Sequence, residues 1–280
     1  MRYRINQAHK RALQAWESTS GKLRGNLITA YWWTDHVNFG DLITPALLKS
    51  YGLTPQFQEP AKAALVSTGS ILQRLPQSFD GIVLGSGLIE NNPVPLPGAR
   101  FLAVRGELSR ECAGAPLDVA LGDPGLLAYR LLAKQPKKSH QIAVIPHYLD
   151  KDDPILDQWL NTHFSQTLLI DVERKPKAVI RDIARCEYVA SSSLHGVIIA
   201  HALGVPAVWL RISDKLKGGD FKFRDYASAL NMQLATMDLE RDLTTESIIT
   251  AATLPNAEVL GARQKALDEL FQGIAQEFRT

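Results

Sequence analysis

Short apolar runs alternate with helix-like segments along nearly the whole chain. The apolar runs are continuous rather than alternating with polar positions, which is typical of strands that are covered on both faces. In the first half we expect strands at 27–33, 64–67, 82–84, 101–104 and 119–121, and helices at 41–51, 107–113 and 126–133. This alternation predicts a parallel sheet flanked by helices.

A polar, proline-containing segment at 134–139 interrupts the pattern and is the predicted linker. Beyond it we expect strands at 142–145, 168–172, 188–190 and 207–210, and helices at 154–164, 176–186, 194–203, 221–230, 244–252 and 256–278. Two such series predict an α/β fold with two Rossmann-like domains facing each other across a cleft. The predicted units are 1–135 (which would hold the acceptor), 139–255, and a C-terminal helix at 256–280 that packs back on the first domain.

Composition narrows the class of protein. The chain has 280 residues, 45% of them hydrophobic and 21% charged, and its net charge of +2 gives no reason to expect nucleic acid as a partner. No apolar run approaches the roughly 18 residues that span a bilayer, and the N-terminus lacks a signal-peptide core. We therefore expect a cytoplasmic protein in which Cys112 and Cys186 are free thiols.

The first 11 residues contain Arg2, Arg4, Lys10 and Arg11 and no acid. Such a cluster suits the anionic inner face of a membrane, and it equally suits a solvated surface. Peripheral membrane contact therefore stays open, and so does the oligomeric state.

The most informative segment is Ser191-Ser192-Ser193-Leu194-His195-Gly196, which lies between a predicted strand and an apolar helix. Strand–turn–helix junctions hold ligands at the carboxyl ends of strands, and a helix N-terminus suits a phosphate or carboxylate. A histidine there, with a pKa near neutrality, is a natural proton carrier. We expect Ser192 and Ser193 to contact the ligand.

Glycine-bearing turns follow several predicted strands. They are 38–41, 69–70, 85–87 and 122–124. Either they are ordinary turns, or glycine lets the backbone approach a ligand there. On the second interpretation the ligand contacts include Asn38, Gly40, Asp41, Ser70 and Ser86.

Cations and a second histidine complete the candidate site. Arg105 ends a buried strand, where its guanidinium suits a carboxylate or phosphate, or else a structural ion pair. Segment 215–226 carries Lys217, Lys222 and Arg224 beside two glycines, which fits either a phosphate-binding loop or a solvated one. His147 follows another strand, where it is a ligand contact or a structural residue.

Several chemistries are disfavoured. No histidine or cysteine pair has metal-ligand spacing, so no metal site is predicted. Gly-x-Ser-x-Gly and the nucleotide phosphate loop are absent, and no clean Gly-x-Gly-x-x-Gly follows the first strand.

Taken together, the motifs resemble the polysaccharide pyruvyltransferase family. They lie in the same order from about residue 26 to 230, at 38–41, 85–87, 104–106, 122–124, 192–196 and 218–226. The resemblance implies a GT-B-like fold, as in two-domain glycosyltransferases. It also implies transfer of a pyruvyl group from phosphoenolpyruvate to two hydroxyls of a sugar, as a cyclic ketal, with release of phosphate. Some members have an arginine two positions before the histidine, where this chain has Ser193.

Our hypothesis is therefore a pyruvyltransferase that acts on a bacterial surface glycan precursor, lipid-linked or otherwise, with phosphoenolpyruvate as donor and no cofactor. The catalytic candidates are His195 and Arg105. Two alternatives stay open: a nucleotide-sugar glycosyltransferase of the same architecture, and a binding module without catalysis. Selective stabilisation by phosphoenolpyruvate or by a nucleotide sugar would distinguish the first two.

Overall fold

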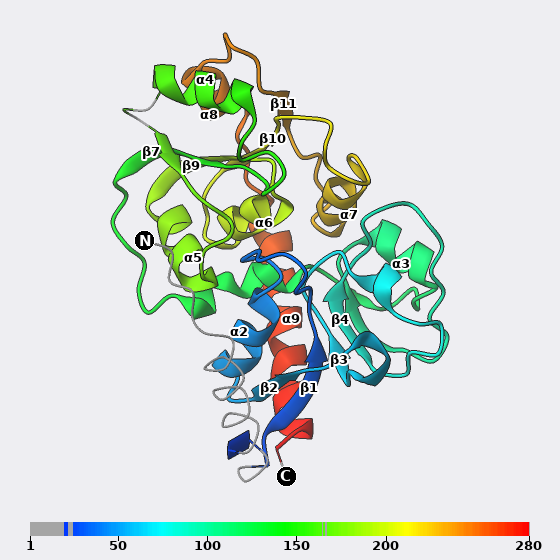
Figure 1. Cartoon of the computed structure of the whole chain (residues 1–280). Coiled ribbons are helices and arrows are strands. Elements are labelled where there is room, and N and C mark those ends of the chain that lie inside the picture. Colours follow the sequence, from blue (N-terminus) through cyan, green and yellow to red (C-terminus); the bar gives the residue numbers. More distant parts are fainter. Residues whose placement is uncertain (1–19, 22–24, 164, 166, 280) are drawn as a thin grey trace.

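The computed structural model describes residues 20–21, 25–163, 165 and 167–279 (Figure 1). The basic cluster of Arg2, Arg4, Lys10 and Arg11 lies outside the described residues. The fold is α/β and contains two parallel sheets, consistent with a two-domain Rossmann-like arrangement.

The first sheet has six parallel strands in the order β2-β1-β3-β4-β5-β6. The strands are β1 Leu27–Tyr31, β2 Thr54–Phe57, β3 Leu65–Val66, β4 Ile82–Ser86, β5 Arg100–Val104 and β6 Ala120–Leu121, and the helices are α2 Ile43–Ser50 and α3 Glu107–Ala113. Strand β2 was not predicted, because it is a short edge strand that contains polar residues and a proline. The helix expected at 126–133 is a 3₁₀ helix at Pro124–Leu131, capped by the Asp123 side chain.

The second sheet has five parallel strands in the order β11-β10-β9-β7-β8. The strands are β7 His140–Ile145, β8 Thr167–Leu169, β9 Cys186–Ser191, β10 Ala207–Arg211 and β11 Thr236–Asp238; the helices are α4 Pro154–His163, α5 Pro176–Ala184, α6 Leu194–Ala202, α7 Phe221–Ala229 and α8 Thr245–Ala251. Every residue of α6 is buried, as expected of a helix that is apolar all round except for His195 and His201. The short edge strand β11 was not predicted.

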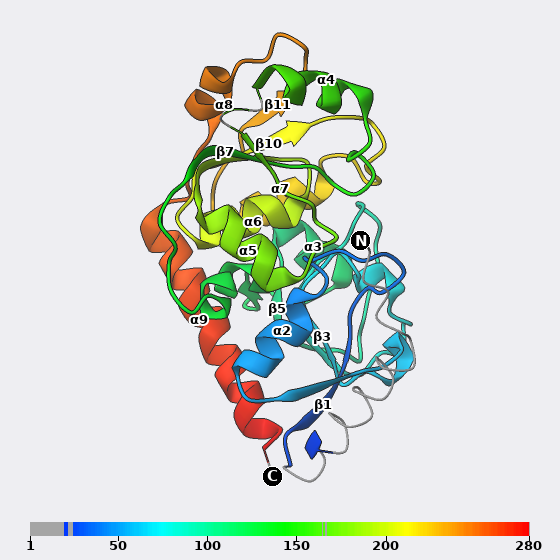
Figure 2. The same ribbon diagram turned by 60° about the vertical axis from the view of Figure 1, so that its left-hand side comes forward.

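The last helix, α9 Ala257–Glu277, extends from the second half along the first (Figure 2). Phe271 stacks on Tyr51 with ring centroids 5.1 Å apart, and Glu277 accepts two hydrogen bonds from Arg100, at 2.9 and 2.6 Å. The C-terminal helix therefore packs on the first half, as its apolar spacing predicts.

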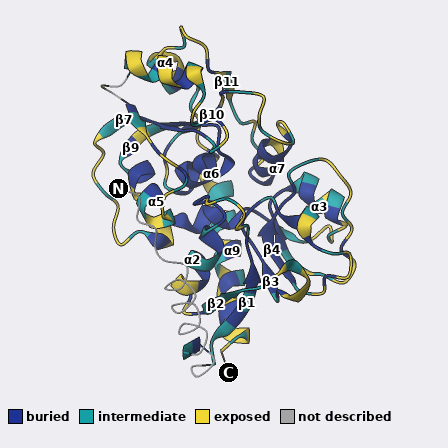
Figure 3. Ribbon diagram, viewed as in Figure 1, coloured by how far each residue is buried: buried dark blue, intermediate teal, exposed yellow. Residues whose placement is uncertain are grey.

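The two halves share buried surface. One apolar cluster includes Leu84 and Ala103 from the first sheet and Ala143 and Val189 from the second. The sheets form the buried centre of each half, and exposed residues gather on loops and outer helices (Figure 3). Among the described residues, no helix combines the length and apolarity needed to cross a membrane. The boundaries 1–135, 139–255 and 256–280 stay a prediction.

Candidate functional site

A pocket of about 320 Å³ is lined by residues of both halves. The first half supplies loops that follow β1, β3 and β4. The second half supplies loops that follow β7, β9 and β10, together with the start of α6 and of α7. The polar lining residues are Asn38, Asp41, Ser70, Gln73, Arg74, His147, Tyr148, Ser193, His195, Lys217 and Lys222. Carboxyl ends of parallel strands thus meet at one place, which is where α/β folds bind ligands.

The turn at 38–41 fits closely against His195. Within the turn, the Gly40 N–H donates to Asn38 Oδ1 at 3.2 Å. A Cβ on Gly40 would lie 2.1 Å from the Nδ1 of His195, so only glycine leaves room for the ring. The turn also reaches the second half, because the Phe39 N–H donates to the carbonyl of Val172 at 2.8 Å.

His195 lies in the first turn of α6 and faces Asp123. Its Nε2 is 3.8 Å from Asp123 Oδ2, beyond hydrogen-bond distance. Burial, together with the charges of Arg105 and Lys222, lowers the pKa of His195 to about 3. This corrects the expectation of a pKa near neutrality, because a pKa this low makes His195 a neutral imidazole at physiological pH.

Asp41 and Lys222 are buried ionisable groups that titrate nearer neutrality. Burial raises the pKa of Asp41 to about 7, although Lys222 opposes this shift. Burial and the charge of Arg105 lower the pKa of Lys222 to about 8, although Asp150 and Asp41 oppose it. The pocket therefore holds a cation and a carboxyl that can change charge near physiological pH.

Arg105 differs from its predicted role in direct ligand contact. Its side chain is 0% exposed and donates from Nε to Asp225 Oδ2 at 2.8 Å. It also donates to the Leu88 carbonyl and to the hydroxyl of Ser70, which lines the pocket. The expectation is corrected because the guanidinium is enclosed behind the wall, where it supports Ser70 and Asp225. This is the structural ion pair that the sequence left open.

Ser192 supports the pocket rather than lining it, because it is fully buried. Its hydroxyl donates to Asp150 Oδ2 at 2.6 Å and accepts from the His147 N–H at 2.8 Å. His147 itself lines the pocket. Burial lowers its pKa to about 3, helped by Lys222 and His36, so this ring is also neutral.

Two further candidates do not line this pocket. Ser86 is fully buried, and its hydroxyl donates to the Gly69 carbonyl at 2.9 Å. Arg224 lies on another face of α7, where its Nη1 is 3.7 Å from Asp220 Oδ2. The Ser86 hydroxyl is occupied within the core, and helical geometry turns Arg224 away from Lys222. Their ligand contacts stay a prediction that this pocket does not support.

Comparison with known proteins identifies the family. The sequence matches the polysaccharide pyruvyl transferase family over residues 67–214. The chain belongs to this family. The matched region includes Ser70, Arg105, Asp123, His147 and His195.

Two relatives are similar to parts of this chain. It is 28% identical over 230 residues to the succinoglycan biosynthesis protein ExoV of Rhizobium meliloti (strain 1021), which covers 79% of this chain and 71% of ExoV. It is 30% identical over 163 residues to an uncharacterized protein of Acanthamoeba polyphaga mimivirus, covering 54% of this chain and 55% of that protein. The chain thus spans about half the length of the viral relative.

The sequence-based prediction did not assign a site role to three acidic residues. Asp123 faces His195, Asp150 holds Ser192 and Ser213, and Asp225 pairs with Arg105. The sequence did indicate a site role for Asp123, because this residue follows Gly122 at the end of a predicted strand. Asp150 and Asp225 gave none, because their partners lie 42 and 120 residues away in the sequence.

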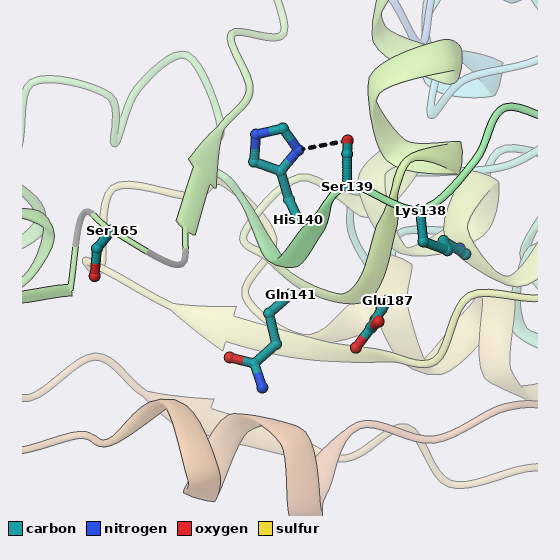
Figure 4. Close-up of a pocket in the computed structure, with 6 residues that line it drawn as sticks. All are labelled: Lys138, Ser139, His140, Gln141, Ser165 and Glu187. Atoms are coloured by element: carbon teal, nitrogen blue, oxygen red, sulfur yellow. Dashed lines mark hydrogen bonds between the residues drawn. The ribbon is translucent and has the colours of Figure 1, made fainter.

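A second hollow lies at the opposite, amino ends of β7 and β9 (Figure 4). It has a volume of about 490 Å³ and is lined by Lys138, Ser139, His140, Gln141, Ser165 and Glu187. The hydrogen bond drawn there joins Ser139 Oγ and His140 Nδ1 at 3.0 Å. None of the predicted site residues lines it, so the pocket between the halves remains the candidate active site.

Proposed function

We propose that this protein transfers the pyruvyl group of phosphoenolpyruvate to two hydroxyls of a sugar in a surface glycan precursor. The product is a cyclic ketal, and inorganic phosphate leaves. Membership of the polysaccharide pyruvyl transferase family and the relationship to a succinoglycan biosynthesis protein support this class of reaction.

The observation that carries the proposal is the composition of the inner pocket. Lys222 lines it with only 7% of its surface exposed, beside the first turn of α6. Burial disfavours its ammonium form more than the charges of Asp150 and Asp41 favour it, so an anion in the pocket would stabilise the ammonium. A helix N-terminus adds N–H groups and partial positive charge. A small donor with both a phosphate and a carboxylate matches these groups.

His195 is the proton carrier in this proposal. C3 of phosphoenolpyruvate takes up a solvent proton and becomes a methyl group as the sugar oxygen bonds to C2, so the electrons of the C2=C3 bond form the new C–H bond. The neutral ring accepts the proton of the attacking hydroxyl in this step and afterwards returns it to solvent. The dianionic donor beside the ring favours the imidazolium that forms in between.

The second hydroxyl completes the ketal. Its oxygen bonds to C2 while the bond between C2 and the phosphate oxygen breaks, and its proton leaves with inorganic phosphate. Lys222 stabilises the negative charge on the departing phosphate. Arg105 adds positive potential from behind the wall, and Asp41 lines the same pocket as a further group that can change charge.

The test is a turnover assay with phosphoenolpyruvate and a panel of glycans that includes lipid-linked, nucleotide-linked and free acceptors. We expect acceptor-dependent phosphate release and a product whose mass and methyl resonance match a pyruvyl ketal. His195→Ala should unfold at a temperature close to that of the wild type and lose turnover by about 100-fold or more. Absence of acceptor-dependent phosphate release across the panel would refute the proposal.

A further inference from the structure

Asp123 and His195 each present a polar atom to the other without a hydrogen bond. The atoms are Oδ2 of Asp123 and Nε2 of His195, 3.8 Å apart. Both are buried, and neither has a hydrogen-bond partner in the part of the chain that the structure describes. Buried polar atoms are nearly always paired, so two orphans that face each other indicate a function.

The surroundings hold both groups in place. The other carboxylate oxygen of Asp123 accepts from the Gly125 N–H at 2.8 Å, which caps the 3₁₀ helix. His195 lies against Gly40, and its ring meets Phe39 edge to face at 6.4 Å. The packing leaves the two atoms facing each other, and a shift of a fraction of an ångström brings them within hydrogen-bond distance. Catalytic hydrogen bonds are often long before the ligand binds.

We propose that Asp123 is a positioning residue that fixes the tautomer of His195, by accepting a hydrogen bond from its Nε2–H once the donor is bound. This inference rests on the proposed function for its role in turnover. With the proton on Nε2, Nδ1 carries the lone pair and accepts the hydroxyl proton. The carboxylate then stabilises the imidazolium without itself taking a proton.

The charge state of Asp123 agrees with this role. Burial raises its pKa to about 6, while the Gly125 N–H and the charge of Arg105 oppose the rise. Asp123 is therefore mainly ionised at neutral pH. An ionised carboxylate can only accept, so it selects the Nε2–H form of the ring.

Asp123→Asn tests the idea cleanly. The Gly125 N–H needs an oxygen acceptor, so the asparagine oxygen takes that position and the amide NH₂ faces His195. An NH₂ group can only donate, which forces the lone pair onto Nε2 and the proton onto Nδ1. The helix cap is retained, so the variant should fold.

The direct measurement is the tautomer of His195, from ¹⁵N resonances of the histidine-labelled full chain with phosphoenolpyruvate present. His195→Gln assigns the resonance. His201 is an internal reference, because its Nε2 lies 3.1 Å from the Thr253 carbonyl and must carry a proton. We expect His195 to be protonated on Nε2 in the wild type and on Nδ1 in Asp123→Asn, with His201 unchanged.

Kinetics supply the second measurement. Asp123→Asn should lower kcat about 100-fold or more and change KM for phosphoenolpyruvate little, because the histidine is present in the wrong tautomer. The same tautomer in both proteins, or an unchanged kcat, would overturn the inference. If both proteins show the expected tautomers but the wild type transfers no pyruvyl group, the proposed function fails and the pairing of Asp123 with His195 stands.

Discussion

Arg105 at the end of β5 and Asp225 in α7 form a fully buried ion pair that joins the two halves of the protein. Arg105 Nε lies 2.8 Å from Asp225 Oδ2, and both side chains are 0% exposed. Asp225 also accepts from the N–H and hydroxyl of Ser109, at 2.7 and 2.5 Å. Since α7 also carries Lys222, this pair fixes the cation of the pocket relative to the first half.

Asp225→Ala should destabilise the protein by about 3–5 kcal/mol, because it leaves a guanidinium buried without its counter-ion. The matched control is Asp238→Ala, which removes an exposed carboxylate from its pair with Arg211. That change should lower the free energy of unfolding by less than about 1 kcal/mol. Denaturant unfolding measures both, and equal losses would contradict the structural role of the buried pair.

Gly40→Ala should abolish turnover, because the added Cβ would overlap the imidazole of His195 and displace it. We expect a loss of about 1–3 kcal/mol in unfolding free energy from overpacking. Gly261→Ala is the control, because a Cβ there meets nothing within 4 Å in helix α9. It should stabilise the helix by up to about 1 kcal/mol and preserve activity. An active Gly40→Ala protein would show that His195 need not stay against this turn.

Asp41→Asn should stabilise the protein, and by more at pH 8 than at pH 5. Burial raises the pKa of Asp41 to about 7 from an ordinary 3.8. Between these two pH values the folded state keeps a proton on Asp41 that the unfolded chain has released. The contribution of Asp41 to the free energy of unfolding therefore falls as pH rises, by about 1.4 kcal/mol per pH unit at most. Asparagine removes this penalty. Urea unfolding of the wild type and of Asp41→Asn at pH 5 and pH 8 measures the difference in unfolding free energy. A variant less stable than the wild type at pH 8 would contradict the prediction.

Lys222→Met should weaken phosphoenolpyruvate binding by at least about 10-fold, because it removes a buried charge that faces the anion. Its unfolding free energy should not fall, since the variant no longer buries an ammonium. Lys265→Met is the control, because Lys265 is 77% exposed on α9 and its Nζ is 3.9 Å from Glu269 Oε1. Calorimetric titration measures the affinity of each variant for phosphoenolpyruvate. Equal affinities of Lys222→Met and Lys265→Met would show that Lys222 does not contact the donor.

The sequence predicted local structure well where one segment determines it. Helix α3 begins and ends at the predicted residues, and the apolar strands of both sheets lie where continuous apolar runs stand. Strands β2 and β11 escaped prediction, because short edge strands carry polar residues that resemble loops.

The candidate site was predicted less completely. The junction at His195 and the turn at 38–41 could be recognised, because each is one contiguous motif. The burial of Arg105 could not, because it depends on Asp225, which is brought near only by the folded contact between α3 and α7. Likewise the low pKa of His195 results from burial and from cations distant in the sequence.

In our proposal the pocket between the halves binds phosphoenolpyruvate as the donor. The decisive experiment is calorimetric titration of the wild-type protein with phosphoenolpyruvate and, separately, with nucleotide sugars. We predict saturable one-to-one binding of phosphoenolpyruvate that Lys222→Met weakens, and no binding of the nucleotide sugars. Saturable binding of a nucleotide sugar, with none of phosphoenolpyruvate, would contradict the claim and favour a glycosyltransferase.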